Sequence, residues 1–295
     1  MSRPETNPVV EHPRPPFPDQ GLTEPGTESQ MSPRPEYRGD DYRPAGKLLG
    51  KVALVTGGDS GIGRSVAVLF AKEGADVAII YLEEHSDAEE TRAAIQECGR
   101  DALLIPGNVC DPEFCRQAID QVIEWRGGLN ILVNNAAYQK HQSGVEDISL
   151  EQWERTFQTN IYGYFHMVKA ALPHLRAGDS IINTSSVTGL EGEKELIDYS
   201  STKGAINAFT KSLAQNLVPR GIRVNGIAPG PIWTPLNPAE RPDEKMHQFG
   251  AGTPMGRPGQ PEEMAPAYVF FASNADSSYI SGHILPLLGG STTSG

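Results

Sequence analysis

The fold is decided by the stretch Val52-Ala53-Leu54-Val55-Thr56-Gly57-Gly58-Asp59-Ser60-Gly61-Ile62-Gly63. Residues 52–56 form a short apolar run that predicts a buried strand, and a helical pattern follows the glycines to about Glu73. Glycines between a strand and a helix let a pyrophosphate approach the free N–H groups of the helix N-terminus. The motif alone leaves a merely tight turn open as the alternative.

The rest of the chain alternates short apolar runs with helical patterns. Further strands are expected at residues 77–81, 103–106, 131–133, 180–184, 223–228 and 284–287, and helices at 86–98, from Asp111 onward, at 149–175, 198–218 and 261–273. Helices of this length between strands require right-handed crossovers and a parallel sheet covered on both faces. The sequence therefore predicts one α/β domain with a doubly wound parallel sheet of about seven strands, whose ligands bind at the carboxyl ends of the strands.

Composition excludes several classes of protein. The 295 residues carry a formal net charge of -12, and the pI of about 5.1 argues against binding to a nucleic acid backbone. No apolar run is long enough for a membrane helix, and the N-terminus lacks a hydrophobic signal core, so a cytoplasmic protein is expected. Three cysteines without CxxC spacing indicate free thiols, and the seven histidines lack ligand spacing, so no metal is expected.

Residues 1–46 differ from the remainder of the chain. They contain ten prolines, at positions 4, 8, 13, 15, 16, 18, 25, 33, 35 and 44, and few β-branched residues. Such a segment cannot bury a core of its own, so we expect an extended arm at 1–46 followed by a folded domain at 47–295. For residues 1–30 a free tail is slightly favoured over a segment docked on its own or a neighbouring subunit. If the arm docks, Tyr37 and Tyr42 are the expected anchors.

A pair of residues in the 198–218 helix suggests proton transfer. Tyr199 and Lys203 are four apart, so they share one helix face. A fixed ammonium beside a phenol stabilises the phenolate and lowers the pKa of the phenol. By itself the spacing is also typical of a solvated helix face. The segments that follow the other strands decide between the two interpretations.

Those segments resemble one family. Residues 56–63 are similar to the TGxxxGIG loop of the classical short-chain dehydrogenase/reductase family, and Asn134-Asn135-Ala136-Ala137 resembles its NNAG segment with Ala137 in place of glycine. Asn160, Ser186, Tyr199 and Lys203 match its catalytic set, and Pro229-Gly230 with Thr234 matches its PGxxxT segment. The resemblance extends over residues 48–290. The arm and segments such as 81–84 and 257–261 resemble the bacterial general-stress, glucose/ribitol-dehydrogenase-like branch.

The resemblance implies a Rossmann-type fold and a role for each residue of the set. Tyr199 would exchange a proton with the substrate oxygen, Lys203 would lower the pKa of Tyr199 and bind the nicotinamide ribose, Ser186 would hold the substrate oxygen, and Asn160 would hold a water. The implied cofactor-binding residues are Gly57, Asp59, Ser60, Gly61, Ile62, Gly63, Tyr81, Leu82, Asn108, Val109, Asn134, Ala136, Ala137, Tyr199, Lys203, Pro229, Gly230, Ile232 and Thr234.

The choice between NAD and NADP is open at this point. Tyr81 stands where NAD-preferring members usually have Asp, and Ser60 stands where NADP-preferring members have a basic residue. Glu83 and Glu84 follow, and their charge would repel a 2′-phosphate. NAD is therefore the favoured cofactor, with NADP as the alternative.

The substrate pocket is expected to be lined by Ser186, Tyr138, Gln139, Leu190 and Trp233, together with His141, Val187, Thr188 and Ile197. For Trp233, plain packing in the core is an equal alternative to substrate contact. Residues 231–252 are rich in Pro, Gly and mixed charges and predict a mobile lid.

These features predict an NAD(P)-dependent oxidoreductase that interconverts a secondary alcohol and its carbonyl, with a small polyol, sugar, ketone or aldehyde as substrate. The alternative is a non-catalytic dinucleotide-binding regulatory or scaffolding protein, against which the complete set of four residues argues. The family resemblance also implies a homotetramer, formed through the helices that begin near Ser149 and Asp198 and through residues 279–290.

Overall fold

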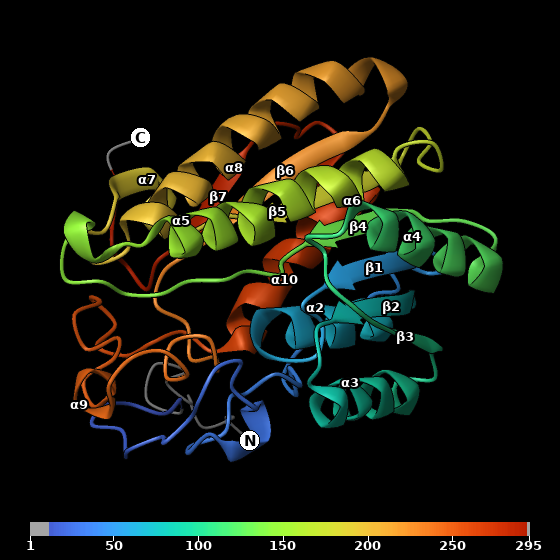
Figure 1. The fold of residues 1–295 in the computed structure, drawn as a ribbon. Helices are drawn as coiled ribbons and strands as arrows, with labels where there is room; N and C mark the ends of the chain where they lie inside the picture. The colour runs from blue at the N-terminus through green and yellow to red at the C-terminus, as the bar shows by residue number, and fades with distance from the viewer. Residues whose placement is uncertain (1–11, 294–295) are drawn as a thin grey trace, which may run out of the picture.

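The computed structural model describes residues 12–293, and a seven-stranded parallel sheet forms its centre (Figure 1). The strands lie in the order β3-β2-β1-β4-β5-β6-β7, and neighbouring strands are parallel throughout. Their bounds are β1 (Val52–Thr56), β2 (Asp76–Tyr81), β3 (Ala102–Pro106), β4 (Ile131–Asn134), β5 (Ser180–Thr184), β6 (Arg223–Pro229) and β7 (Ile284–Leu287).

Helices cover both faces of the sheet (Figure 1). The helices and helical turns are η1 (Glu28–Gln30), α2 (Gly61–Lys72), α3 (His85–Glu97), α4 (Pro112–Arg126), η2 (Val145–Asp147), α5 (Leu150–Phe157), η3 (Gln158–Tyr162), α6 (Gly163–Ala171), α7 (Thr188–Glu191), α8 (Ile197–Leu217), η4 (Val218–Arg220), α9 (Asp243–Met246), α10 (Pro261–Ala272) and α11 (Asn274–Ser277). One apolar core joins α2, α3 and α10 to the sheet, and the other joins α4, α6 and α8 to its opposite face.

The predicted fold class is confirmed: the chain forms one doubly wound α/β sheet with ligand-facing loops at the carboxyl ends of the strands. Local signals placed several ends correctly. Asp111 accepts a hydrogen bond from the Glu113 N–H and starts α4, and Ser149 accepts one from the Gln152 N–H and starts α5. The long helix expected at 149–175 is instead interrupted by the π-helical turn η3 and ends at Ala171.

The arm lies along its own domain from residue 12 onward, next to the lid residues near α9 (Figure 1). Phe17 and Met31 pack into a small apolar cluster with Trp233, Met246 and Phe249. The free tail favoured for residues 1–30 is therefore wrong for residues 12–30, and residues 1–11 lie outside the described part of the chain. Burial of Phe17 and Met31 in this cluster stabilises the docked arm, and the composition of the arm did not predict that contact.

Both expected anchors of the arm make polar contacts with helices. The hydroxyl of Tyr37 donates to Glu90 of α3 over 2.9 Å, and the hydroxyl of Tyr42 donates to Glu73 at the end of α2. Among residues 12–293, no helix combines the length and the apolar character that a membrane crossing requires.

Candidate active site

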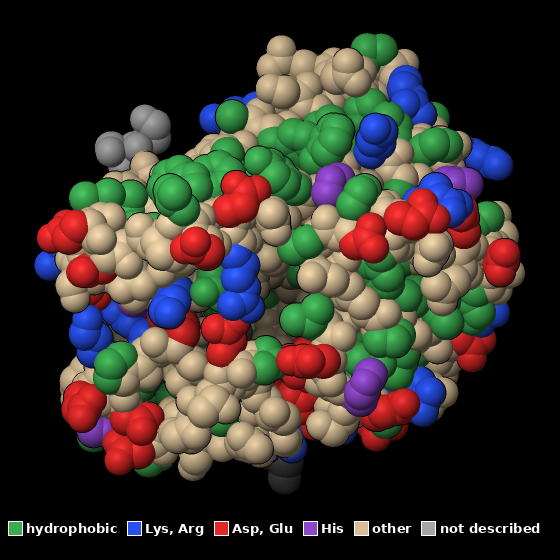
Figure 2. Space-filling model, viewed as in Figure 1, with side chains coloured by type: hydrophobic (Ala, Val, Ile, Leu, Met, Phe, Trp, Pro, Cys, Tyr) green, Lys and Arg blue, Asp and Glu red, His purple; other side chains and the backbone are tan. Residues whose placement is uncertain are grey.

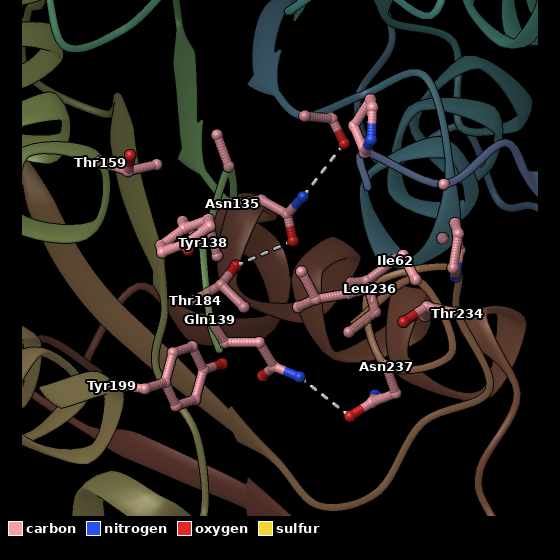
Figure 3. Close-up of a pocket in the computed structure, with 18 of the residues that line it drawn as sticks. Ile62, Asn135, Tyr138, Gln139, Thr159, Thr184, Tyr199, Thr234, Leu236 and Asn237 are labelled. Atoms are coloured by element: carbon pink, nitrogen blue, oxygen red, sulfur yellow. Dashed lines mark hydrogen bonds between the residues drawn. The ribbon is translucent and has the colours of Figure 1, made fainter. Parts of the chain in front are cut away.

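A cavity of about 560 Å³ opens at the carboxyl edge of the sheet, where the loops after β1 and β4 diverge (Figures 2 and 3). Asn135 links the two loops. Its backbone N–H donates to Thr56 Oγ1 over 2.9 Å, and its side-chain Nδ2 donates to the carbonyls of Thr56 and Gly57, each over 3.1 Å. Thr184 at the end of β5 also contacts Asn135. These hydrogen bonds of Asn135 fix the two loops relative to each other at the crevice that the strand order predicts.

Most of the residues expected to bind a dinucleotide line this cavity. They are Gly57, Asp59, Ser60, Gly61, Ile62, Tyr81, Leu82, Asn108, Val109, Ala136, Ala137, Tyr199, Lys203, Pro229, Gly230, Ile232 and Thr234. They come from the ends of five strands, β1, β2, β3, β4 and β6, or the segments that follow them, and from helix α8, so the fold brings together positions that are distant in sequence.

Gly63 and Asn134 do not line the cavity, in contrast to the expectation. A Cβ on Gly63 would lie 1.8 Å from the carbonyl oxygen of Gly57, so glycine is required there for close packing of α2 against the loop. Asn134 is buried in β4, where its Nδ2 donates to Asn183 Oδ1 over 2.9 Å. Both residues support the loops beneath the cavity.

Tyr199 and Lys203 are buried together in the cavity wall. Lys203 Nζ donates to the Thr184 carbonyl over 2.8 Å and lies 5.3 Å from the centroid of the Tyr199 ring. The tyrosine ring points into the cavity, with its hydroxyl toward the side chain of Gln139 (Figure 3). The helix α8 therefore presents the phenol and the ammonium on one face, as their spacing predicts.

Burial controls the protonation of both groups. It raises the pKa of Tyr199 well above its ordinary value, and hydrogen bonding from Ser186 opposes only part of that rise. It also lowers the pKa of Lys203 from 10.5 to about 7. The expected lowering of the Tyr199 pKa by Lys203 is not found in this structure, because loss of hydration favours the neutral form of each group.

Ser186 and Asn160 occupy different places. Ser186 lines the cavity, and its Oγ accepts hydrogen bonds from the N–H and the hydroxyl of Thr188, each over 3.1 Å. Asn160 is fully buried in η3 and does not line the cavity. Its side chain pairs with the backbone N–H and carbonyl of Tyr138 and donates to Thr202 Oγ1. Its amide thus fixes the loop after β4 against α8.

The expected substrate residues divide in the same way. Tyr138 and Gln139 line the cavity, together with His141, Val187 and Thr188. Leu190, Ile197 and Trp233 do not. Leu190 is 40% exposed on α7.

Trp233 is the clearest correction among the expected substrate contacts. It is fully buried, stacks on Phe17 with ring centroids 4.1 Å apart, and donates from Nε1 to the carbonyl of Pro33 over 2.8 Å. Its side chain holds the arm instead of a ligand.

Several residues of the cavity wall were not expected from the sequence. The lid contributes Asn237 and Glu240, whose side chains accept hydrogen bonds from Gln139 Nε2 over 3.0 and 3.1 Å (Figure 3). The arm contributes Glu24, which forms an ion pair with Arg155 of α5. The mixed charges of 231–252 were a usable signal for the lid residues. Nothing in the composition of the arm distinguished Glu24.

One group of side chains has the donor spacing of a metal site. Ligand atoms of His12, Glu36 and Glu262 lie within 4.8 Å of one another, outside the cavity. His12 Nδ1 and Glu36 Oε2 are already paired at 2.5 Å within the arm, and His12 Nε2 lies 3.7 Å from Glu263 Oε1 of α10, so these atoms serve contacts of the arm.

Known proteins share the sequence pattern and the fold of this chain. A family model described as enoyl-(acyl carrier protein) reductase matches residues 57–292. General stress protein 39 of Bacillus subtilis is 54% identical over 90% of this chain and 93% of its own length, and the glucose and ribitol dehydrogenase of Daucus carota is 49% identical over 94% and 97%. The crystal structure of a short chain dehydrogenase from Burkholderia cenocepacia in complex with NADP has a TM-score of 0.77 and 34% identity, covering 83% of this chain and 98% of that one.

The chain belongs to the short-chain dehydrogenase/reductase family. It is an NAD(P)-dependent oxidoreductase that transfers hydride between nicotinamide and an alcohol or carbonyl, and it is similar to the general-stress and glucose/ribitol-dehydrogenase-like proteins. The alternative of a non-catalytic dinucleotide-binding protein is not supported. The cavity fits such a cofactor, because the glycines at its edge and the N-terminus of α2 leave room and donors for a pyrophosphate.

The lowered pKa of Lys203 predicts a pH-dependent stability. Between about pH 7 and 10 the unfolded chain holds a proton on Lys203 that the folded chain releases, so the free energy of unfolding should rise with pH in this window. Replacing Lys203 by Met should flatten that rise, as measured by urea unfolding of the cofactor-free protein at pH 7, 8, 9 and 10. Lys211→Met, at an exposed position of the same helix, is the control and should keep the wild-type slope. Equal slopes in all three proteins would contradict the assignment.

Proposed function

We propose that the substrate is a small polyol or sugar, oxidised at a secondary hydroxyl or formed from the carbonyl. The observation that carries this proposal is the polar wall opposite Tyr199. Gln139 donates to Asn237 over 3.0 Å (Figure 3) and to Glu240 over 3.1 Å. His141 adds its ring, whose Nδ1 lies 2.5 Å from Glu240 Oε1.

This wall offers both donors and acceptors to a ligand. Amides supply one of each, whereas a carboxylate only accepts. A substrate with several hydroxyl groups can satisfy such a mixed set, while an apolar ketone would leave these groups without partners. Similarity to the glucose and ribitol dehydrogenase of Daucus carota supports the same class of substrate.

We assign the proton transfer to Tyr199. Its phenol, with a raised pKa, suits donation of a proton to the carbonyl oxygen in the reducing direction. Ser186 would hold that oxygen. The Lys203 ammonium would stabilise the negative charge that Tyr199 acquires when it gives up its proton. A bound nicotinamide would supply or accept the hydride. Asn160 would act indirectly, by fixing the loop that carries Tyr138.

Tyr199→Phe should lower kcat by roughly 10²- to 10⁴-fold, because it removes the only group assigned to general acid-base transfer. Turnover is followed at the nicotinamide absorbance with pentitols, hexitols, aldoses, ketones and aldehydes. Affinity for NADH, measured by its fluorescence, should stay nearly unchanged. Tyr268→Phe is the matched control: it removes another buried hydroxyl, which contacts Thr184 but lies outside the cavity. A Tyr199→Phe enzyme that keeps most of its rate would refute the assignment, and activity confined to apolar ketones would refute the substrate class.

We also propose that NAD is preferred over NADP. Asp59 and Glu84 both line the cavity at the end near Tyr81, whereas Glu83 is exposed and does not. Burial, followed by repulsion from Glu84, raises the pKa of Asp59 to about 7. Above that pH two carboxylates would face a 2′-phosphate and repel it. The NADP bound in the Burkholderia cenocepacia enzyme keeps NADP as the alternative cofactor.

The expected result at pH 8 is a kcat/KM for NAD at least about tenfold above that for NADP. Replacing Asp59 by Asn and Glu84 by Gln should narrow this ratio, mainly by improving the use of NADP. Glu83→Gln removes the neighbouring exposed charge and should leave the ratio nearly unaltered. A preference for NADP in the wild-type enzyme would overturn the proposal.

We further propose a homotetramer that buries the outer face of α5, η3 and α6. Hydrophobic side chains gather in a band on this side of the molecule (Figure 2). The exposed members include Leu150, Trp153, Tyr162 and Phe165, with exposed fractions of 83%, 38%, 43% and 49%. Contiguous apolar surface of this kind is typical of subunit interfaces.

Phe165→Glu should place a charge in that interface and shift the protein from tetramer to smaller species, as seen by light scattering coupled to size exclusion. Leu49→Glu, at a site 75% exposed before β1, should leave the assembly unchanged. A wild-type monomer at micromolar concentration would contradict the proposal.

Two further proposals concern the division into domains and the cellular location. We propose that residues 47–295 form the catalytic domain and residues 1–46 an accessory arm. We propose a cytoplasmic location, which agrees with three cysteines that form no disulfide. Fractionation of the source cells tests the location.

A further inference from the structure

A buried carboxylate of the arm contacts the dinucleotide loop. Glu28 lies in η1 and has no exposed surface. Its Oε2 accepts a hydrogen bond from the Gly61 N–H over 2.5 Å, and its Oε1 accepts one from Arg64 Nη1 over 2.7 Å. The backbone N–H of Glu28 donates in turn to Asp87 of α3 over 2.7 Å. Glu28 therefore joins the arm to the first turn of α2.

Arg64 carries this contact onward to the loop itself. Its guanidinium is fully buried, and its Nε donates to the carbonyl of Asp59 over 2.8 Å. Thr91 of α3 donates to the same carbonyl over 3.1 Å. Hydrogen bonds therefore fix both ends of the loop 59–61: Arg64 binds the carbonyl of Asp59, and Glu28 binds the N–H of Gly61. Asp59, Ser60 and Gly61 line the cavity, whereas Glu28 and Arg64 do not.

The charges around Arg64 show that this arrangement is costly to break. Glu28, Asp87 and Glu90 all lie within 3.5 Å of the guanidinium. Burial raises the pKa of Glu28 to about 7, and Arg64 and the Gly61 N–H oppose this rise. Removing one partner from such a buried pair leaves the other without full compensation. Without Glu28, the N–H groups of Gly61 and Arg64 would lose their acceptor, and the loop would shift to find another one.

The arm also forms part of the cavity wall next to this contact. Glu24, Pro25 and Gly26 line the cavity. A Cβ on Gly26 would lie 2.7 Å from Ala239 Cβ, so the arm and the lid pack closely there. The segment 24–28 therefore spans the distance from the lid to the glycine loop.

We propose that Glu28 is a positioning residue for dinucleotide binding, which makes the arm a working part of the cofactor site. Glu28 sets the loop 59–61 through Gly61 and Arg64, and the loop presents its remaining N–H groups to the pyrophosphate of the dinucleotide. The inference rests on dinucleotide binding in this cavity and is independent of the proposed substrate.

The test compares full-length variants at pH 8, where the wild-type carboxylate is charged. Glu28→Ala should weaken the binding of NADH by about tenfold, the effect of losing a charge-assisted hydrogen bond. ADP-ribose, which lacks the nicotinamide, should lose affinity by a similar factor. At saturating cofactor, kcat should change less than twofold, so the effect appears in KM for the dinucleotide. Glu28→Gln keeps an acceptor for the Gly61 N–H and should recover part of the affinity.

Tyr42→Phe is the matched control, because it removes an arm contact at the opposite end of α2, where Tyr42 binds Glu73. It should lower the thermal midpoint without changing the affinity for NADH or ADP-ribose. Binding is measured by fluorescence and calorimetry without substrate, well below every thermal midpoint. If Glu28→Ala does not fold, Glu28→Gln alone decides. Affinities within twofold of wild type in the Glu28 variants would overturn the proposal, and so would equal weakening in Tyr42→Phe. Failure of the polyol assay would leave these outcomes unaffected.

Discussion

The active site depends on the pairing of β1 with β4. These two strands are adjacent and parallel, yet the chain leaves them toward opposite faces of the sheet, into α2 after β1 and toward α5 after β4. The loops must therefore separate, which opens the crevice at the carboxyl edge. Asn135 sets the separation, since its amide and backbone bind Thr56 and Gly57 on the other side. The glycine loop and the Tyr199 face of α8 then meet across one cavity.

The burial of two titratable groups in the wall of that cavity determines its chemistry. Tyr199 and Lys203 are both buried, and each is pushed toward its neutral form. The pair therefore rests as a phenol beside an ammonium that releases its proton readily. Ionisation of the Tyr199 phenol is unfavourable in the free enzyme. When the substrate oxygen acquires negative charge during reduction, the phenol shares its proton with that oxygen, and this interaction stabilises the transition state more than the ground state. The carbonyl of Thr184 anchors the ammonium so that this pairing keeps a fixed geometry.

The sequence predicted those parts of the molecule that depend on local signals. The run 180–184 and the helix beginning at Asp111 could be placed because β-branched runs and capping residues act over a few positions. The position of Trp233 could not be predicted in this way. Its stacking partner Phe17 lies in the arm, and a contact between segments so far apart leaves no periodic pattern. The π-helical turn around Asn160 is likewise set by the tertiary contact with Tyr138.

The arm shows how a segment without a core can still be ordered. Fixing the backbone costs about 1–2 kcal/mol per residue, and prolines reduce this cost because the unfolded chain has fewer conformations to lose. The remaining cost is offset by contacts with groups that the domain leaves without partners. The first N–H groups of α2 have no acceptor within their own helix, and Glu28 supplies one to Gly61. Trp233 Nε1 needs an acceptor once it is buried, and the Pro33 carbonyl provides it. The domain and the arm therefore complete each other's hydrogen bonds at the cofactor loop and beside the lid, and this is why a sequence with the composition of a tail lies along the active site.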